Sequence, residues 1–210
     1  MTDLRNTDSR KTDSRKTGTH MNDSTTQRGF GIVTALTIVR LPLSLLFAAL
    51  VLATEPDSTT LTIGVVLLSL IEITDGLDGY LARRLGAESK FGAILDPYSD
   101  AVSRVTVYWA LAACGKTYLF MPLALGIRDV TVAYCRIVWT RANRSAGALL
   151  SGKIKAVVQG VGAFTLLLAP HWFPDLTWLP PVTAWVVVLV TYVSLFEYVA
   201  QTLPLLRNKP

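Results

Sequence analysis

The stretch that decides the fold runs from Asp75 to Asp100 and reads DGLDGYLARRLGAESKFGAILDPYSD. Asp75 and Asp78 are three residues apart, so they share one face if this segment is helical. Gly92, Asp96 and Asp100 follow at spacings of four and line one face of the next segment. The connection between the two segments is short, which predicts antiparallel neighbouring helices that bring both pairs of aspartates together.

Four carboxylates in one low-dielectric place predict a metal site, because they cannot all stay charged without a counter-charge. Oxygen ligands suit Mg²⁺ or Mn²⁺, and a pair of such ions would clamp a pyrophosphate. No histidine or cysteine is nearby in the sequence, so zinc is not expected. Gly79 and Ala82 continue the face of Asp75 and leave room for a ligand, and Arg83 could contact pyrophosphate oxygens. The alternative is that the aspartates are helix caps and surface charges.

The composition of the rest of the chain is typical of an integral membrane protein. Of its 210 residues, 51% are hydrophobic, in blocks of about 20 residues that match the length of a bilayer crossing. Six spans are predicted, near residues 30–53, 61–82, 91–114, 118–140, 154–168 and 182–203, of which the fifth is the shortest. The predicted fold class is therefore all-α, with six transmembrane helices.

The loop charges predict the orientation of these spans. Basic loop residues fall on one side, except for Lys116. The positive-inside rule then places both termini in the cytoplasm. The net charge of +5 is not gathered on one stripe, so a nucleic acid is not an expected partner.

Several further charges lie inside the apolar blocks, where they are costly unless paired, hydrated or metal-bound. Besides the four aspartates, these are Arg40, Glu72, Arg104, Arg128, Asp129, Arg136 and Glu197.

Residues 1–28 differ from the rest of the chain. They are polar and repetitive, with TDSRK at 7–11 repeated at 12–16. Such a segment buries too little apolar surface to offset chain entropy, which predicts a disordered cytoplasmic tail ahead of a membrane domain at 29–210.

The spacing DxxDGxxAR, eight residues, GxxxDxxxD resembles the complete signature of the CDP-alcohol phosphotransferases. The resemblance implies a membrane enzyme of six helices, usually dimeric, with a polar cavity open to the cytoplasm; in a bacterium this is the inner membrane. It implies that the acceptor hydroxyl attacks the lipid-side phosphorus of a CDP-linked lipid and that CMP leaves. By the same resemblance, Asp75, Asp78 and Asp96 bind Mg²⁺ or Mn²⁺, as two ions, and Asp100 binds metal and acts as the base. The positions that line the CDP-lipid pocket are Gly79, Ala82, Arg83 and Gly92.

The acceptor site is expected in the second half of the chain. Arg128 and Arg136 are eight residues apart on the fourth span, and Lys153 and Lys155 open the fifth. Cations that share a cavity would suit an acceptor carrying a phosphate. The alternative is that Arg128 pairs with Asp129 and that the lysines only set topology.

The segments 126–129 and 152–159 resemble the phosphatidylglycerophosphate synthase branch of this family. That resemblance implies CDP-diacylglycerol as donor and glycerol 3-phosphate as acceptor. Two positions depart from the branch: Ala101 stands where lysine is usual, and Ala156 where threonine is usual. Arg104, one turn beyond Asp100, could replace the charge of the missing lysine. Inositol phosphate is the nearest rival acceptor.

A membrane transporter is the alternative from a different class, because intramembrane charges also mark ion paths. The sequence shows no internal repeat and no matched pair of broken helices, which disfavours that reading. The expected partners are therefore CDP-diacylglycerol, a small alcohol acceptor, membrane lipid and a second copy of the chain.

Overall fold

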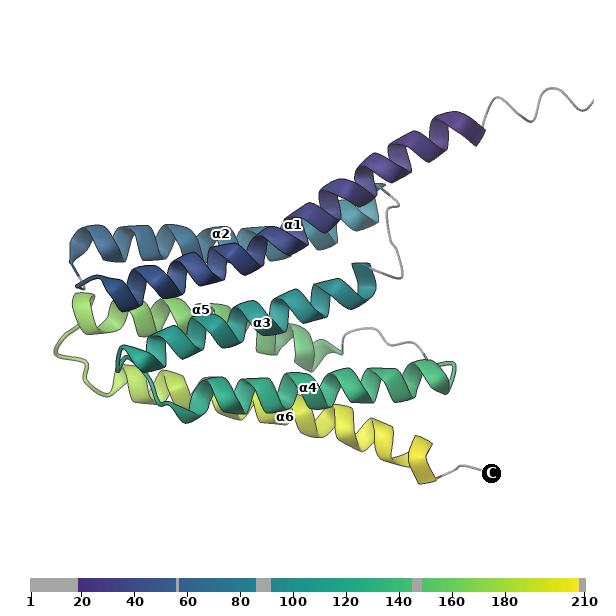
Figure 1. Ribbon diagram of the computed structural model, residues 1–210. Coiled ribbons are helices and arrows are strands. Elements are labelled where there is room, and N and C mark those ends of the chain that lie inside the picture. Colours follow the sequence, from purple (N-terminus) through teal and green to yellow (C-terminus); the bar gives the residue numbers. More distant parts are fainter. Residues whose placement is uncertain (1–18, 56, 86–91, 145–148, 208–210) are drawn as a thin grey trace, which may run out of the picture.

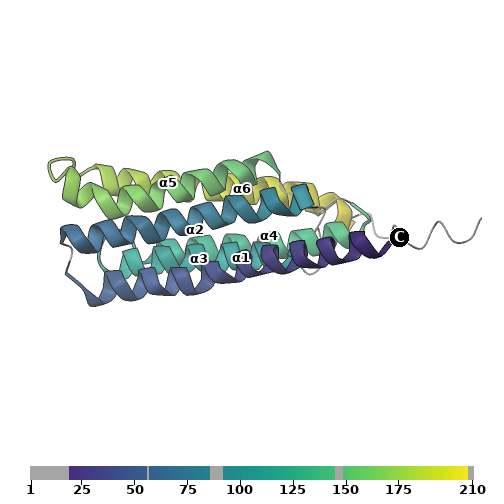
Figure 2. The same ribbon diagram turned by 90° about the horizontal axis from the view of Figure 1, so that it is seen from above.

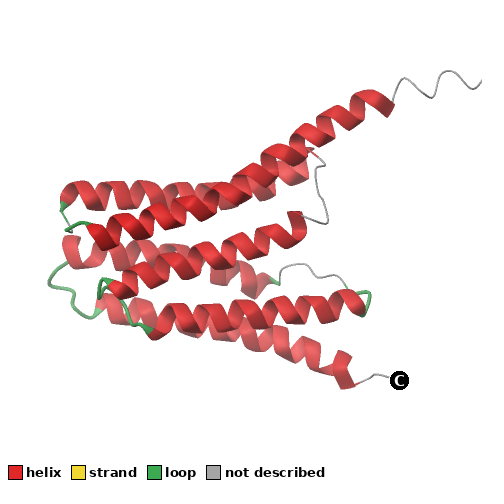
Figure 3. Cartoon of the chain, viewed as in Figure 1, coloured by secondary structure: helices red, strands yellow, loops and turns green. Residues whose placement is uncertain are grey.

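The structure is a computed structural model that describes residues 19–55, 57–85, 92–144 and 149–207. Within these helices, the side chains of residues 19–34, 78, 79, 81–83, 85, 93 and 94 lie outside the description. The described residues form six helices that run side by side as one elongated bundle (Figures 1 and 2). They are α1 (Thr19–Ala53), α2 (Ser58–Leu85), α3 (Gly92–Ala113), α4 (Phe120–Arg141), α5 (Leu150–Trp172) and α6 (Leu179–Arg207). The described parts of the chain contain helices and loops and no strand (Figure 3).

Short turns reverse the chain between successive helices, and local side chains and glycine fix some of these turns. Ahead of α2, Asp57 Oδ1 accepts a hydrogen bond of 2.7 Å from the backbone N–H of Thr60, which caps the helix. After α3, Gly115 has a φ of +70°, the left-handed conformation that ends many helices. The C-terminal ends of α2, α4 and α6 lie at the same end of the bundle (Figure 1).

The main core lies where all six helices meet. The buried residues there include Phe47 of α1, Leu68 of α2, Leu111 of α3, Leu125 of α4, Leu166 of α5 and Val187 of α6. A smaller cluster around the stacked rings of Trp139 and Tyr198 joins α4 to α6.

Four of the helices contain segments that are long and apolar enough to cross a membrane: 35–53 of α1, 58–77 of α2, and the whole of α5 and α6. These helices indicate a membrane protein. Helices α3 and α4 do not meet the same criterion, because charged residues such as Asp100 and Arg128 interrupt their apolar sequence. Large apolar side chains also face outward, among them Leu123, Tyr134 and Phe196, as expected where lipid replaces water.

The expected all-α architecture and number of helices are confirmed, with different bounds. Helix α5 is longer than the predicted 154–168 at both ends. Helix α1 begins at Thr19, ahead of the first span predicted near residues 30–53, so it includes residues 19–28 of the predicted tail. That segment contains neither glycine nor proline, and a helix already nucleated in apolar sequence extends into such a segment at little cost. Residues 1–18 lie outside the described part of the chain.

Candidate active site

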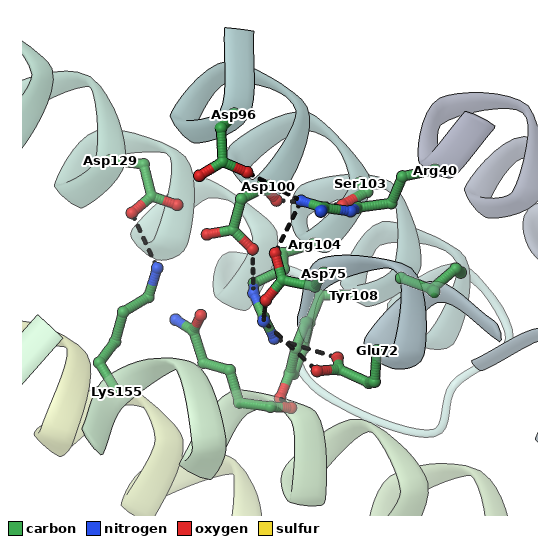
Figure 4. Close-up of polar contacts among 12 residues, drawn as sticks. Arg40, Glu72, Asp75, Asp96, Asp100, Ser103, Arg104, Tyr108, Asp129 and Lys155 are labelled. Atoms are coloured by element: carbon green, nitrogen blue, oxygen red, sulfur yellow. Dashed lines mark hydrogen bonds and ion pairs between the residues drawn. The ribbon is translucent and has the colours of Figure 1, made fainter. Parts of the chain in front are cut away.

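Two helices bring three of the predicted aspartates to one place. Asp75 comes from α2 and Asp96 and Asp100 from α3, and they turn toward two arginine side chains (Figure 4). Arg40 of α1 places Nη1 2.8 Å from Asp75 Oδ1 and 3.8 Å from Asp96 Oδ1. Helices α2 and α3 are thus linked through a single buried guanidinium.

The second arginine, Arg104, is one turn beyond Asp100 on α3. Its Nε donates a hydrogen bond of 2.7 Å to Asp100 Oδ1. Its terminal nitrogens lie 3.2 and 3.5 Å from the two carboxylate oxygens of Glu72, and Nη2 lies 3.7 Å from Asp75 Oδ2. A buried charge needs such partners, because removing it from water is costly.

The aspartates and the arginines of the site differ in solvent exposure. The side chain of Asp96 is 53% exposed and that of Asp75 31%, whereas Arg40 is only 1% exposed. Arg104 is similarly buried. The arginines therefore approach the carboxylates from the protein interior, and the carboxylates remain accessible from the opposite side.

The donor chemistry of this cluster fits a hard divalent cation. Asp75, Asp96 and Asp100 offer only oxygen ligands, which Mg²⁺ and Mn²⁺ prefer. Arg40 Nη1 lies within ion-pair distance of two of these carboxylates, so a positive charge is already favoured between them. Among the described side chains, no three acidic, histidine or cysteine residues gather in a metal-binding arrangement. The side chain of Asp78, the fourth predicted ligand, is not among them.

The predicted CDP-lipid positions lie on the same two helices. Gly79, Ala82 and Arg83 belong to the last part of α2, and Gly92 begins α3. The side chains of Ala82 and Arg83 lie outside the description, so their predicted contacts stay predictions.

A cluster of opposite charge lies next to the carboxylates. Asp129 Oδ1 accepts from Arg128 Nη1 at 2.8 Å and from Lys155 Nζ at 3.0 Å. Arg128 Nη2 also donates to Ser194 Oγ at 2.6 Å, which links α4 to α6. Lys155 interacts electrostatically with Asp100, and in the view of Figure 4 Asp100 lies between Arg40 and the Lys155–Asp129 pair.

Tyr198 of α6 gathers the two arginines of α4. The guanidinium carbons of Arg128 and Arg136 lie 5.5 and 5.8 Å from the centre of its buried ring. Its hydroxyl lies 3.4 Å from Arg136 Nη2 and accepts a 3.0 Å hydrogen bond from the backbone N–H of Leu149, just ahead of α5.

Only three of the four cations predicted to bind the acceptor lie together. These are Arg128, Arg136 and Lys155, whereas Lys153 is exposed. Two residues apart on a helix, the lysines point in different directions. The alternative in which Arg128 pairs with Asp129 also holds, but Lys155 shares that carboxylate, so the cluster keeps an excess of positive charge.

Sequence reasoning assigned no role to several of these residues. Arg40 and Glu72 stood out only as charges inside apolar blocks, and that signal implies a partner without naming it. Ser194 and Tyr198 gave no signal, because a lone hydroxyl residue in an apolar span is ordinary.

Residues 31–196 match the CDP-alcohol phosphatidyltransferase family, which is most of the chain. This chain belongs to the CDP-alcohol phosphatidyltransferase family. Membership confirms the family inferred from the aspartate spacing. It makes the chain a transferase that joins the phosphatidyl group of a CDP-linked lipid to an alcohol, and it disfavours the transporter alternative.

Three named relatives are similar in sequence to most of this chain. The CDP-diacylglycerol–glycerol-3-phosphate 3-phosphatidyltransferase of Treponema pallidum (strain Nichols) is 31% identical over 154 residues, which cover 69% of this chain and 71% of the relative. The Bacillus subtilis (strain 168) protein of the same name is 27% identical over 192 residues, 85% of this chain and 98% of the relative. A Mycobacterium tuberculosis (strain ATCC 25618 / H37Rv) protein provisionally named cardiolipin synthase is 30% identical over 152 residues, 70% of this chain and 71% of the relative.

Proposed function

We propose that this protein transfers the phosphatidyl group of CDP-diacylglycerol to glycerol 3-phosphate, forming phosphatidylglycerophosphate and CMP. The observation that carries the proposal is the position of Asp100 between the carboxylate cluster and a buried group of cations (Figure 4). A site with metal-binding oxygens on one side and phosphate-binding cations on the other suits a reaction between two phosphate-bearing substrates. The printed names of the Treponema and Bacillus relatives favour the same acceptor.

On the donor side, Asp75, Asp78, Asp96 and Asp100 would hold two ions of Mg²⁺ or Mn²⁺. Bound there, the ions supply a positive charge that offsets the negative charge of the pyrophosphate and of the departing CMP. The positions that line the CDP-lipid pocket are Gly79, Ala82, Arg83 and Gly92. Arg40 holds Asp75 and Asp96 together from the buried side, which keeps the ligands in place.

In the transfer step, Asp100 acts as the general base. Its carboxylate takes the proton from the acceptor hydroxyl, because an alcohol is a weak nucleophile near neutral pH. The oxygen then forms a bond to the phosphorus that carries diacylglycerol. The bond from that phosphorus to the CMP oxygen breaks, and CMP leaves with the electron pair.

On the acceptor side, Arg128, Arg136 and Lys155 bind the phosphate. Asp129 holds Arg128 and Lys155 together. Its second oxygen, Oδ2, is buried and has no partner among the described side chains, so the carboxylate can shift its contacts when phosphate enters. Lys153 is exposed and acts, at most, in attracting the acceptor.

Two other acceptors use the same chemistry. Inositol phosphate would also place a phosphate among the cations. The provisional name of the Mycobacterium tuberculosis relative favours the alcohol group of a lipid, phosphatidylglycerol, as a second candidate.

The proposal includes the topology expected from the sequence. All six helices cross the membrane, α3 and α4 included, because their charges turn toward the bundle interior. Both termini and the site open to the cytoplasm, which in a bacterium means the inner membrane, and two copies form a homodimer.

The test is CMP release by the purified protein with CDP-diacylglycerol and Mg²⁺ or Mn²⁺. Glycerol 3-phosphate, inositol phosphate and phosphatidylglycerol are supplied separately. Release with glycerol 3-phosphate, lost in Asp100→Asn and kept in Glu197→Gln, is the expected result. Release only with another acceptor would overturn the choice of acceptor. Absence of release with every acceptor, from folded protein, would overturn the proposed function, and ion flux in protein-containing liposomes would then test for a transporter.

A further inference from the structure

We propose that Glu72 and the buried Arg104 form an ion pair that positions the carboxylate of Asp100 for the transfer step. This inference rests on the proposed function, in which Asp100 is the general base. Glu72 lies outside the aspartate signature, one turn before Asp75 on α2. Neither residue needs to touch a substrate, so both are positioning residues.

The first step of the argument is the orientation of Arg104. A guanidinium is planar and carries its donors in a fixed fork, so two separate contacts fix its plane. The two terminal nitrogens face the carboxylate of Glu72 at 3.2 and 3.5 Å, and Nε is left to face Asp100 Oδ1 at 2.7 Å (Figure 4). Glu72 therefore determines which nitrogen of Arg104 meets Asp100.

The second step is the competition for Arg104. Asp75 Oδ2 lies only 3.7 Å from Arg104 Nη2, while Asp75 is also held by Arg40 at 2.8 Å. Without the carboxylate of Glu72, Arg104 Nη2 would still have Asp75 Oδ2 within ion-pair distance. Arg104 would then turn toward a proposed metal ligand and away from Asp100.

The third step is the space made for Glu72. A Cβ atom added to Gly160 of α5 would lie 3.0 Å from the Glu72 carboxylate carbon and from its Oε2. Contacts this close leave the neighbour little room. Because Gly160 has no side chain, the Glu72 carboxylate can lie against α5. Residues of α2, α3 and α5 thus hold Asp100 in place through the contacts of Glu72 with Gly160 and Arg104.

The pair also explains a departure in the sequence. Ala101 follows Asp100 where the synthase branch usually has lysine, and Arg104 is the nearest described cation on the same helix. Arg104 reaches back to Asp100 along the face of α3 at a spacing of four, the distance at which helical ion pairs form.

The test compares Glu72→Gln, Arg104→Gln and the double variant with the unaltered protein. CMP release is measured with CDP-diacylglycerol and the acceptor that supports turnover. We expect each single variant to lower kcat by about 10- to 100-fold, the range found for residues that orient a metal ligand. The KM values for both substrates should stay unchanged. The double variant should be no slower than Arg104→Gln alone, because Glu72 acts through Arg104.

Two controls separate positioning from folding. Glu197→Gln makes the same carboxylate-to-amide change on α6 and should keep full kcat. Glu72→Asp keeps the charge on a shorter stem and should recover part of the kcat lost in Glu72→Gln. Specific activity is measured on the monodisperse, folded fraction of each variant.

If the unaltered protein is active, two outcomes would overturn the positioning role of Glu72 and Arg104. One is full kcat in Glu72→Gln. The other is a loss in the double variant equal to the product of the single losses, since this would make the two residues independent. Absence of CMP release by the unaltered protein would instead overturn the proposed function, and with it the base assigned to Asp100.

Discussion

At the scale of single residues, the site depends on side chains that lie behind the predicted ligands. Arg40 and Arg104 hold the aspartates from the interior. Tyr198 holds Arg128 and Arg136, which with Lys155 form the proposed acceptor cluster. Arg40, Arg104 and Tyr198 are each buried, so their geometry is fixed before a substrate arrives. Preorganised charges of this kind stabilise a transition state without reorganisation during the reaction.

Tyr198→Phe tests the acceptor cluster. The change removes the hydroxyl that accepts from the backbone N–H of Leu149 and lies near Arg136, but keeps the ring stacked on Trp139. We expect a stability loss of about 1 kcal/mol, the usual value of one hydrogen bond. We also expect a raised KM for glycerol 3-phosphate, with the KM for CDP-diacylglycerol unchanged. Steady-state kinetics and thermal unfolding in detergent measure both effects.

The matched control is Tyr192→Phe, on the same helix. It should change neither the acceptor KM nor the unfolding temperature by a comparable amount. An equal rise in the KM of both substrates in Tyr198→Phe would contradict a role confined to the acceptor.

At the scale of helices, close approach decides which elements surround the site. Gly162 of α5 faces Val187 of α6 and the hydroxyl of Tyr108 on α3. Small residues at such positions let membrane helices pack backbone to backbone. The same helix carries Lys155, so its close packing also fixes the position of the acceptor cluster.

Gly162→Ala should therefore destabilise the bundle. The added Cβ would lie 2.6 Å from Val187 Cγ2 and 2.8 Å from Tyr108 Oη, closer than real contacts allow. Overpacking of this kind costs about 1–3 kcal/mol. Thermal unfolding in detergent measures the loss. Gly76→Ala is the control, because a Cβ there meets nothing within 4 Å, and its unfolding temperature should not fall.

The turn before α2 makes stability depend on pH. The backbone N–H of Thr60, through its hydrogen bond to Asp57, holds the pKa of the Asp57 carboxyl below its usual value. A carboxyl whose pKa is lowered in the folded state adds to the free energy of unfolding. That stabilisation is fully present above the unfolded-state pKa and is lost as pH falls through the folded-state pKa. Asp57→Ala should thus lower the unfolding temperature at neutral pH, with a difference that shrinks in acid.

Unfolding curves of Asp57→Ala across that acidic range check the prediction. Glu55→Ala, on the same exposed turn, is the control and should show a smaller difference. A gap between Asp57→Ala and the unaltered protein that grows on acidification would contradict the capping role.

At the scale of the whole molecule, charge distribution and bundle topology specify one orientation. The C-terminal ends of α2, α4 and α6 lie at the same end of the bundle (Figure 1). Basic residues gather at that end, with Arg84 near the end of α2, Arg141 at the end of α4 and Arg207 at the end of α6, whereas Lys116 lies in the turn at the other end. The positive-inside rule predicts that this end faces the cytoplasm.

Single-cysteine labelling tests this orientation. With Cys114 and Cys135 replaced by alanine, a cysteine at Lys116 should react with a membrane-impermeant reagent from outside intact cells. A cysteine at Arg144 should react only in inverted vesicles. Labelling of both positions from the same side would contradict six crossings. Unchanged CMP release by the cysteine-free protein serves as the control for folding.

The sequence by itself determined the family, the all-α class, the number of helices and the positions of the aspartates. Helical spacing is local, so Asp96 and Asp100 share a face whatever surrounds them. The length of an apolar block likewise determines its ability to cross a bilayer. The first helix was placed less well: Thr19 begins α1, because polar sequence without glycine or proline extends a helix that apolar sequence has nucleated.

Only the tertiary structure decided which distant residues complete the site. Arg104 meets Glu72 from 32 positions away in the chain, and Tyr198 meets Arg136 from 62 positions away. No local pattern determines such pairs, because they depend on how helices pack and rotate against one another. The same packing buried Lys155 beside Asp129 and left Lys153 exposed, although the two lysines are almost adjacent in the sequence.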